Sequence, residues 1–513
     1  MNKKIVALAV LIVAGFVSCN QFMKPKPTEE ISAAPVIKAL PQDPSLQVYF
    51  NQSQTSSYTE PYRQVTRPGH DLEQLMVYSI NSARESVDVA VQELRLPRIA
   101  QALAHRHRSG IKVRLIIENL YNRPVALSPS QVKALPKRER DRYAELVHLA
   151  DTDKDGSLSD TEISSGDALA IVREAGIPMI DDTADGSKGS GLMHHKFIVI
   201  DGKTLIVTSA NFTTSDIHGD FKSAESRGNP NNLLKMQSPE LAKVFSEEFS
   251  QMWGDGPGGK PDSKFGVKKA IRPLASGARS AIARVSVGGA TVSVQFSPAT
   301  SKTPWQQTPN GLIDRTLASS SKSVNLALFV FSAQQLADTL GRKSQTGVSI
   351  RALVDSSFVY RPYSEAMDMM GASLLEGCKL EVENRPWSQP LATVGMPKLP
   401  LGDRLHHKFG VVDGTKVITG SHNWTEAANR ANDETLLVIE SATVGAHFEQ
   451  EFVACGARSA IESIKAQFWV CPSASSRKWI RANLNANRRI SSPRWRFFFK
   501  AIHNPQQRFA LRI

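Results

Sequence analysis

The chain has 513 residues, of which 41% are hydrophobic and 22% are charged. This length exceeds what one hydrophobic core supports, so we expect two domains of roughly 200 residues with appendages. The net charge of +13 does not describe a basic body, because residues 477–513 carry ten basic side chains and no acidic one, which leaves +3 for the rest. The net charge of residues 1–476 is therefore too small for this part of the chain to attract nucleic acid through its overall charge.

The chain begins with an apolar segment behind two lysines. The run from Ile5 to Val17 is too short to span a bilayer and has the form of an export signal. Cys19 follows a small residue, as in the lipobox of bacterial lipoproteins, where that thiol carries the lipid. We expect residues 1–18 to be a signal peptide and residues 19–47 a lipidated cysteine with a proline-rich tether, which would place the protein at the outer membrane. The alternative is ordinary cleavage and secretion.

Strands and helices then alternate in an order that the chain repeats. The first series is a strand at 48–50, a helix at 71–82, a strand at 86–92, a helix at 97–106 and a strand at 111–118. The second series runs through 291–296, 311–318, 323–331, 334–341 and 348–355, and each series leads into a His-His-Lys segment. The pattern predicts an α/β fold of two similar domains, 48–256 and 291–457, joined by a linker at 257–290.

The two His-His-Lys segments lie 212 residues apart and share one pattern. Each contains His-x-Lys, an Asp five residues after the lysine, and a Ser-x-Asn shortly downstream. The matching residues are His194, Lys196, Asp201, Ser209 and Asn211 in the first half, and His406, Lys408, Asp413, Ser421 and Asn423 in the second.

This spacing suits a phosphodiester. On an extended strand residues i and i+2 face one side, so each histidine shares a surface with its lysine, and a short turn returns the Ser-x-Asn beside them. Two such halves would place two imidazoles across a pocket floored by lysines and asparagines. Cations and amides stabilise charge on the phosphate oxygens. One imidazole can attack phosphorus while the other protonates the leaving alcohol.

The paired motifs resemble those of the phospholipase D superfamily over most of residues 48–455, apart from an insertion. The resemblance implies two α/β/α domains packed as a pseudo-dimer, a phosphohistidine intermediate and no catalytic metal or other cofactor. It implies His194 as the nucleophile and His406 as the general acid and base. Lys196, Lys408, Asn211 and Asn423 would hold the phosphate.

The superfamily often places a carboxylate before a downstream apolar strand to orient the histidine. Glu434 has this place in the second half, whereas Asn231 has it in the first. A neutral amide supports a phosphohistidine cation less well than a carboxylate. The sequence therefore leaves open whether His194 and His406 exchange roles.

The first half carries an insertion, at about 136–176, that the second half lacks. Within it, Asp151 to Glu162 matches the 12-residue EF-hand loop, with helices expected at 138–149 and 167–174. We expect calcium in a structural role, with Ser157 binding through its carbonyl and Ser159 through a water; a solvated acidic loop is the alternative. The expected ligands are Asp151, Asp153, Asp155, Ser157, Ser159 and Glu162.

Residues 458–513 form a basic and aromatic tail, which could bind nucleic acid, lie on an anionic membrane, or extend without a partner.

Besides Cys19 there are Cys378, Cys455 and Cys471, one pair of which could form a disulfide in an oxidising compartment. The sequence does not choose the pair, and it indicates no protein partner.

The sequence favours a hydrolase acting on phospholipid, because an anchor and an aromatic tail suit that substrate. A nuclease is the alternative, since the compact halves resemble the small phospholipase D-type nucleases, whose substrate is DNA or RNA. A phosphatidyl transferase of the cardiolipin-synthase kind and a non-catalytic binding protein are further hypotheses. Export weighs against the transferase, and the intact motifs weigh against the binding protein.

Overall fold

The computed structural model describes residues 37–123, 129–187, 189–261, 282–372, 375–376, 379–380 and 385–457. The expected signal peptide, Cys19, most of the tether and the tail at 458–513 lie outside these residues, as do Cys378 and Cys471 and hence any disulfide between them. Cys455 is buried, and its thiol donates to Glu451 at 3.5 Å. None of the helices in the described ranges combines the length and apolar character that crossing a membrane requires.

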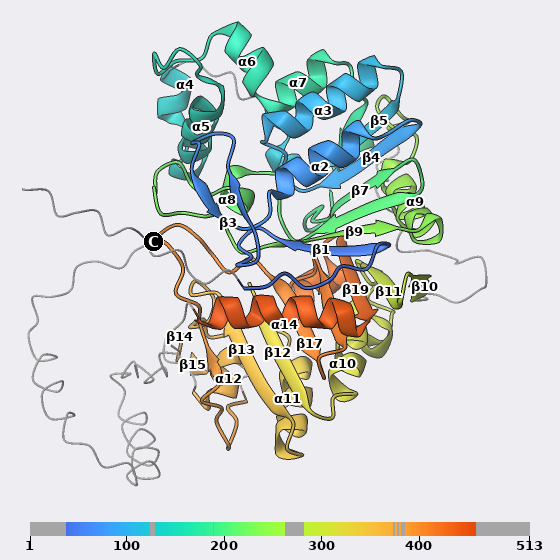
Figure 1. Ribbon diagram of the computed structural model, residues 1–513, viewed down its shortest axis with the longest axis vertical. Helices are drawn as coiled ribbons and strands as arrows, with labels where there is room; N and C mark the ends of the chain where they lie inside the picture. The colour runs from blue at the N-terminus through green and yellow to red at the C-terminus, as the bar shows by residue number, and fades with distance from the viewer. Residues whose placement is uncertain are drawn as a thin grey trace, which may run out of the picture.

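The first half folds around a seven-stranded sheet with strand order β1-β9-β8-β7-β4-β5-β6 (Figure 1). Strands β4, β5 and β6 run parallel, and the other neighbours pair antiparallel. The elements are β1 (Leu46–Phe50), β2 (Ser57–Thr59), β3 (Thr66–Pro68), α2 (Leu72–Asn81), β4 (Ser86–Val91), α3 (Pro97–Arg108), β5 (Lys112–Ile117), α4 (Pro129–Ala134), α5 (Lys137–Ala150), α6 (Asp160–Gly166), α7 (Ala168–Glu174), β6 (Met179–Asp181), β7 (Lys196–Ile200), β8 (Thr204–Thr208), α8 (Thr214–Ile217), β9 (Asn232–Gln237) and α9 (Pro239–Trp253).

The second half repeats this order and adds one edge strand, giving β10-β11-β19-β18-β17-β12-β13-β16. The repeat confirms the predicted duplication and the α/β fold class. The elements are β10 (Ala283–Val287), β11 (Ala290–Ser297), α10 (Pro309–Ala318), β12 (Ser323–Leu328), α11 (Gln334–Gln345), β13 (Ser349–Val354), α12 (Glu365–Met369), β14 (Leu375–Glu376), β15 (Lys379–Leu380), β16 (Val394–Gly395), β17 (Lys408–Val412), β18 (Lys416–Gly420), α13 (Glu426–Arg430), β19 (Glu434–Glu440) and α14 (Ala442–Ala457).

Local chemistry explains where these helices begin. Asp71 caps α2, because its side chain accepts the backbone N–H of Gln74 at 2.9 Å. Thr308 caps α10 in the same way, and Pro309 takes the first helical position, where its missing N–H costs nothing. Both helices start within two residues of the range that their sequence predicts.

One strand lies where the sequence predicts a linker. Strand β10 falls inside residues 257–290 and pairs antiparallel with β11, with Val285 opposite Val292. The sheet of the second domain therefore begins before the predicted boundary at 291. Alternating exposed residues make β10 a half-buried edge strand, whose signal is weaker than that of the buried central strands.

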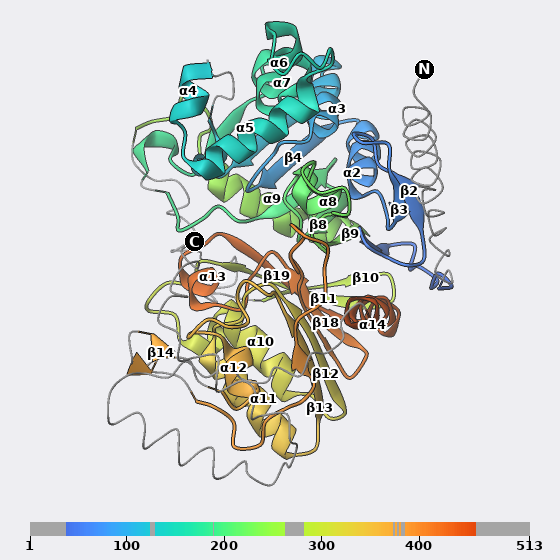
Figure 2. The same ribbon diagram turned by 90° about the vertical axis from the view of Figure 1, so that its left-hand side faces the viewer.

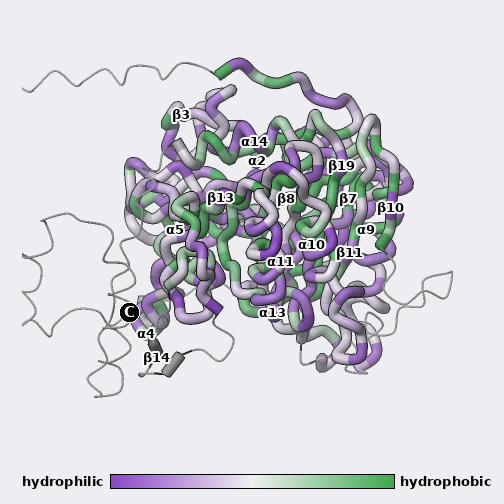
Figure 3. Tube along the Cα trace, turned by 90° about the horizontal axis from the view of Figure 1, so that it is seen from below, coloured by the Kyte–Doolittle hydropathy of each residue, from purple (hydrophilic) through white to green (hydrophobic). Residues whose placement is uncertain are grey.

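One hydrophobic core spans both halves, and each half has a further core of its own. Figure 2 shows the halves stacked, with α9 and α14 near the level where they meet. Helix α14 of the second half contacts β1 of the first, and α9 of the first contacts β10 of the second. The ring of Phe448 stands edge-on to Phe50 at 5.1 Å and to Phe409 at 5.0 Å, so one side chain joins both halves. In Figure 3 the hydrophobic stretches follow interior strands such as β7 and β8.

The insertion folds as a helix, a loop and a helix. Helix α5 leads into the loop, and α6 begins inside it at Asp160, where Ser159 and Glu162 form a reciprocal capping box. The exit helix thus starts earlier than the predicted range of 167–174, which is occupied by the separate helix α7. Figure 1 shows the insertion at the side of the first half.

Candidate active site

The paired motifs lie at the start of equivalent central strands. Lys196 is the first residue of β7 and Lys408 the first of β17, so each histidine immediately precedes a buried strand. The ammonium of each lysine donates to the carbonyl of its own histidine at 2.7 Å. Both lysines are almost completely buried. Burial lowers the pKa of Lys196 to about 8 and that of Lys408 to about 7.

The loops that carry the histidines cross from one half to the other. The backbone N–H of His194 donates to the carbonyl of Asp433 at 2.9 Å, and the N–H of Asp433 donates to Leu192 at 2.8 Å. This short parallel bridge places the residue after Asp433 beside His194. In the same way the N–H of Arg404 donates to the Oδ1 of Asn229 at 2.7 Å, which brings the second histidine loop to the start of β9.

Glu434 contacts the histidine of the other half. Its Oε2 lies 2.7 Å from the Nδ1 of His194 and also accepts the Ser421 hydroxyl at 2.6 Å. Burial opposes ionisation of Glu434, but its contact with His194 outweighs burial and lowers the pKa of the carboxyl to about 2. Burial lowers the pKa of His194 to about 4. At neutral pH the pair is therefore a carboxylate and a neutral imidazole.

The tautomer of His194 follows from this pair. A carboxylate only accepts hydrogen bonds, so the Nδ1 of His194 carries the proton that Glu434 accepts. The Nε2 of His194 then keeps its lone pair. A neutral imidazole with a free Nε2 is the form that a nucleophilic histidine needs.

Asn231 contacts the other histidine. Its Oδ1 lies 3.0 Å from the Nδ1 of His406, and its Nδ2 donates to the carbonyls of Asp216 and Asn229 at 2.9 and 3.0 Å. Because those carbonyls fix the amide orientation, Oδ1 accepts from His406 and also from Ser209 at 2.7 Å. The Nδ1 of His406 is therefore a donor, and its Nε2 is left for another partner. Burial and then the two lysines lower the pKa of His406 well below its usual range.

These contacts correct one sequence-based interpretation. The interpretation paired each histidine with the residue of its own half, so that Asn231 would have served His194. The structure pairs them across the halves, and His194 has the carboxylate. The reason is the crossing of the loops, which no local pattern encodes.

The two motif asparagines lie at equivalent places, three residues after the ends of β8 and β18. The side-chain Oδ1 atoms of Asn211 and Asn423 are buried, and no group in the described part of the chain hydrogen-bonds them. The Nζ of Lys196 also lies 3.4 Å from the Oε1 of Gln92. A buried amide oxygen without a protein partner can accept a hydrogen bond from a ligand or a water.

The motif aspartates do not join the site. Asp201 and Asp413 each lie five residues beyond the lysine, roughly 16 Å along an extended strand. The carboxylate of Asp201 accepts the backbone N–H groups of residues 84–86, and that of Asp413 accepts those of residues 321–323. Their expected place among the catalytic residues is corrected to a structural one, at the entry to β4 and β12.

Two acids that the motifs do not contain hold the histidine loops. Glu118 follows β5 and accepts the backbone N–H of Met193, and Asp355 follows β13 and accepts that of Leu405 at 2.8 Å. Burial raises the pKa of Glu118 to about 7. The only sequence signal for this role is that both predicted strands end in an acidic residue.

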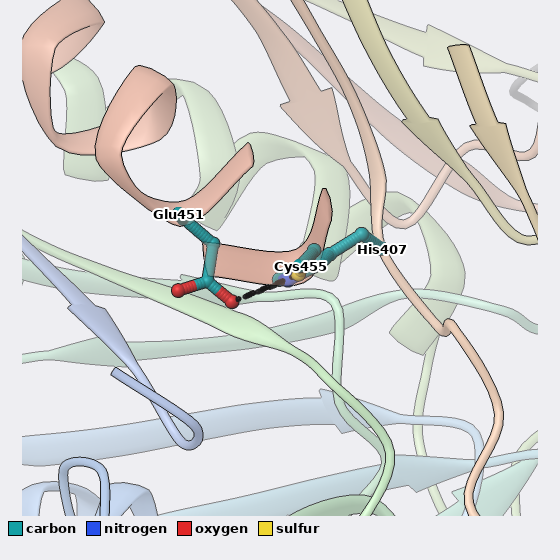
Figure 4. A group of neighbouring side chains, drawn as sticks. All are labelled: His407, Glu451 and Cys455. Carbon is teal, nitrogen blue, oxygen red and sulfur yellow. Dashed lines mark hydrogen bonds and ion pairs between the residues drawn. The ribbon is translucent and has the colours of Figure 1, made fainter. Parts of the chain in front are cut away.

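The second histidine of each segment faces α9 or α14. His195 Nε2 lies 3.1 Å from Glu248, and His407 Nε2 lies 3.1 Å from Glu451. Figure 4 shows the second pair with Cys455 beside it. Because the pairing repeats in the first half, where Met252 takes the position of Cys455, we assign His195 and His407 to holding the helices against the sheets.

Comparison with known proteins gives one family and several relatives. The sequence matches the family described as cardiolipin synthase, PLD-like domain, over residues 76–253 and 313–455. It is 30% identical over 178 residues to a mouse mitochondrial cardiolipin hydrolase, covering 35% of this chain and 56% of the relative. It is 31% identical over 113 residues to a phospholipase D of Rickettsia bellii, covering 22% of this chain and 46% of the relative. The chain thus spans about half the length of the curated relatives it matches.

A solved structure shares the arrangement of both halves. The phosphatidylserine synthase of Haemophilus influenzae Rd KW20 superposes with a TM-score of 0.50 at 11% identity, covering 88% of this chain and 95% of that one. At this identity the likeness concerns the fold alone.

Proposed function

The chain belongs to the family described as cardiolipin synthase, PLD-like domain, and from this membership and the site geometry we propose that it hydrolyses the phosphodiester bonds of phospholipids. His194 is the nucleophile and His406 the general acid and base. The observation that carries the assignment is the 2.7 Å contact between His194 Nδ1 and the buried Glu434 carboxylate. That carboxylate stabilises the positive charge which His194 gains when its Nε2 binds phosphorus.

The reaction has two balanced steps. In the first, His406 must carry a proton on Nε2 as well as on Nδ1. The Nε2 lone pair of His194 attacks phosphorus, the bond to the leaving oxygen breaks, and that oxygen takes the Nε2 proton of His406. In the second, His406 accepts a proton from water, whose oxygen attacks phosphorus, and the phosphorus–nitrogen bond breaks. His194 returns to its neutral form, and the products are an alcohol and a phosphomonoester.

The phosphate would lie between the two histidines. Lys196 and Lys408 are buried cations that do not form an ion pair with a carboxylate within the described ranges. Their charge, with the amides of Asn211 and Asn423, matches the non-bridging oxygens of a diester. The low pKa values of both lysines are those of the site without an anion, and a bound phosphate would raise them.

The phospholipid substrate is supported by the relatives. One is named a cardiolipin hydrolase and another a phospholipase D, and both names refer to phospholipid hydrolysis. A transferase would use the same phosphohistidine with an alcohol in place of water. The assay below separates these outcomes by product.

A hydrolysis assay in parallel tests the proposal. The full chain is offered phosphatidylglycerol and cardiolipin vesicles and, separately, single- and double-stranded DNA, in chelator and again with calcium, with His194→Ala as the blank. We expect phosphatidic acid and a released alcohol from the vesicles and intact DNA. DNA cleavage without phosphatidic acid would replace the lipase assignment by a nuclease, and exchange products with added glycerol would indicate a transferase.

We also propose that the loop from Asp151 to Glu162 binds calcium as an EF-hand. Carboxylate oxygens of Asp151, Asp153 and Asp155 lie within 4.8 Å of one another, which suits a hard cation that prefers oxygen ligands. Lys154 and Gly156 have positive φ values of 63° and 83°, so the backbone turns tightly around these side chains. Ser157 would add its carbonyl, Ser159 a bound water, and Glu162 both carboxylate oxygens. The ion would hold the insertion together and take no part in the chemistry.

A further inference from the structure

A carboxylate outside the paired motifs lies beside His406. Asp216, in α8, is 4% exposed, and its Oδ2 lies 3.8 Å from the Nδ1 of His406. Within the described ranges no other carboxylate comes within ion-pair distance of that ring. The contact crosses from the first half to the second, as the contact between Glu434 and His194 crosses in the opposite direction.

The position of Asp216 is fixed by the site itself. Its Oδ2 accepts the backbone N–H of Asn211 at 2.7 Å, and its Oδ1 accepts the side chain of Asn229 at 2.5 Å. Its backbone carbonyl accepts the Nδ2 of Asn231 at 2.9 Å. The carboxylate is therefore held next to the same amide that contacts His406.

The two halves differ at this point. The position that Asp216 holds in the first motif is Ala428 in the second, counted from the motif asparagine. Conversely, the place that Glu434 holds in the second half is Asn231 in the first. Each half therefore supplies one carboxylate to the histidine of the other half, from two different positions in the chain.

We propose that Asp216 is a positioning residue that replaces the carboxylate missing at Asn231 and stabilises the doubly protonated form of His406 that acts as general acid. The inference rests on the proposed function, because it concerns the proton that His406 gives to the leaving oxygen. Asn231 orients the ring through a hydrogen bond, and Asp216 supplies the negative charge through space. In the proposed reaction His406 loses this proton in the first step and regains one from water in the second.

The surroundings of His406 explain why a carboxylate is needed. Burial, and after it the positive charges of Lys408, Lys196, His194 and His407, disfavour the charged form of the His406 ring. Burial raises the pKa of Asp216 itself, whereas the hydrogen bonds from Asn229 and Asn211 and the two lysines oppose that rise. The net pKa of Asp216 is raised, while the two lysines and its hydrogen-bond donors favour the ionised form, and the neighbouring His406 ring lacks a hydrogen-bonded carboxylate.

The Asp216→Asn variant tests this inference. The change keeps the size of the side chain and one acceptor oxygen and removes the charge. We expect turnover of a dialkyl phosphate ester to drop about tenfold and its alkaline limb to move to lower pH, because the general acid loses its proton earlier. The burst of p-nitrophenolate from bis(p-nitrophenyl) phosphate should change less than about twofold, since that leaving group needs no proton.

A second variant separates charge from structure. Asp216→Asn combined with Asn231→Asp returns a carboxylate to the atom that already contacts His406, and we expect it to recover most of the alkyl ester turnover. Equal losses for both substrates and no recovery in the double variant would overturn the inference. The imidazole NMR signals of His406, titrated in the full chain with and without inorganic phosphate, give an independent reading. We expect its pKa to fall by about one unit in Asp216→Asn, and an unchanged value would refute the role.

The controls distinguish this inference from the proposed function. If the wild-type chain hydrolyses neither ester, the proposed function fails, and the NMR titration still decides whether Asp216 sets the protonation of His406. If the wild-type chain is active and Asp216→Asn behaves like it in both assays, only the inference fails.

Discussion

Glu434 and Asn231 hold the same place in the two halves, and each contacts the histidine of the other half. One supplies a charge and the other only an acceptor oxygen, so the two histidines are chemically different although their motifs are almost identical. This asymmetry supports the proposed assignment of the nucleophilic step to His194. It follows from single residues and can be tested by changing them.

Glu434→Gln should lower turnover by about 100-fold or more, because the imidazolium formed on His194 loses its counter-charge. The sharpest measurement uses a His406→Ala background, in which a p-nitrophenyl diester can phosphorylate His194 but the phosphohistidine hydrolyses slowly. Adding Glu434→Gln should abolish the trapped phosphohistidine. The matched control is Asn231→Ala in the same background, which should leave trapping intact because Asn231 contacts His406. The reverse pattern would show that the histidines exchange roles.

Sequence predicts the residues of the site better than their partners. The motif pattern predicts both histidines, both lysines and both asparagines of the candidate site, because an alternating strand and a tight turn encode their common face. It wrongly includes Asp201 and Asp413, whose spacing to the lysines places them at the far end of the strand. It misses Asp216, because the contact with His406 depends on how two halves pack across 190 residues of chain.

At the scale of elements, the insertion is joined to the site. Glu145 of α5 accepts the hydroxyl of Thr214, the first residue of α8, and α8 carries Asp216. His148 of the same helix stacks on Phe221 at 5.0 Å. The helix that precedes the loop at Asp151 therefore packs against the segment that positions one side of the active site.

Glu162→Gln tests the calcium proposal at this scale. Glu162 accepts the backbone N–H groups of Thr152 and Ser159 at 2.7 and 3.0 Å, so its carboxylate closes the loop from the opposite end. We expect calcium affinity, measured by isothermal titration of the full chain, to fall at least tenfold, because a neutral amide is a poor bidentate ligand. Asp160→Asn removes the same charge from an exposed side chain at a non-ligand position and should change affinity little. Equal affinity in wild type and Glu162→Gln would show that the loop is not an EF-hand site.

Elements with strong patterns are predicted well. The central strands β4 and β12 are almost fully buried, and the helices that precede them, α2 and α10, have side-chain caps, so their ranges are close to those expected. Strand β10 and helix α6 are missed for physical reasons. Strand β10 is a half-exposed edge strand, so its hydrophobic pattern is weak. Helix α6 has only seven residues, and its start is fixed by the capping box of Ser159 and Glu162.

At the scale of the molecule, the two halves depend on each other. The shared core contains residues of both sheets, and the two helices that face it, α9 and α14, each contact the opposite half. The site is likewise complete only when both halves are present, because each histidine takes its partner from the other. Stability and activity should therefore be lost together.

Phe448→Ala in α14 tests this dependence. Phe448 is fully buried and packs against Phe50 of the first half and Phe409 of the second. Removing the ring should lower the free energy of unfolding by about 3–5 kcal/mol, the usual cost of such a cavity. Because the core is shared, hydrogen exchange should accelerate in β1 and β9 of the first half as well as in β17 and β19 of the second.

Val453→Ala on the same helix, where the side chain is 51% exposed, should leave both halves nearly unchanged. Faster exchange confined to the second half would mean that the halves unfold independently and that the common core contributes little to holding the two histidines together.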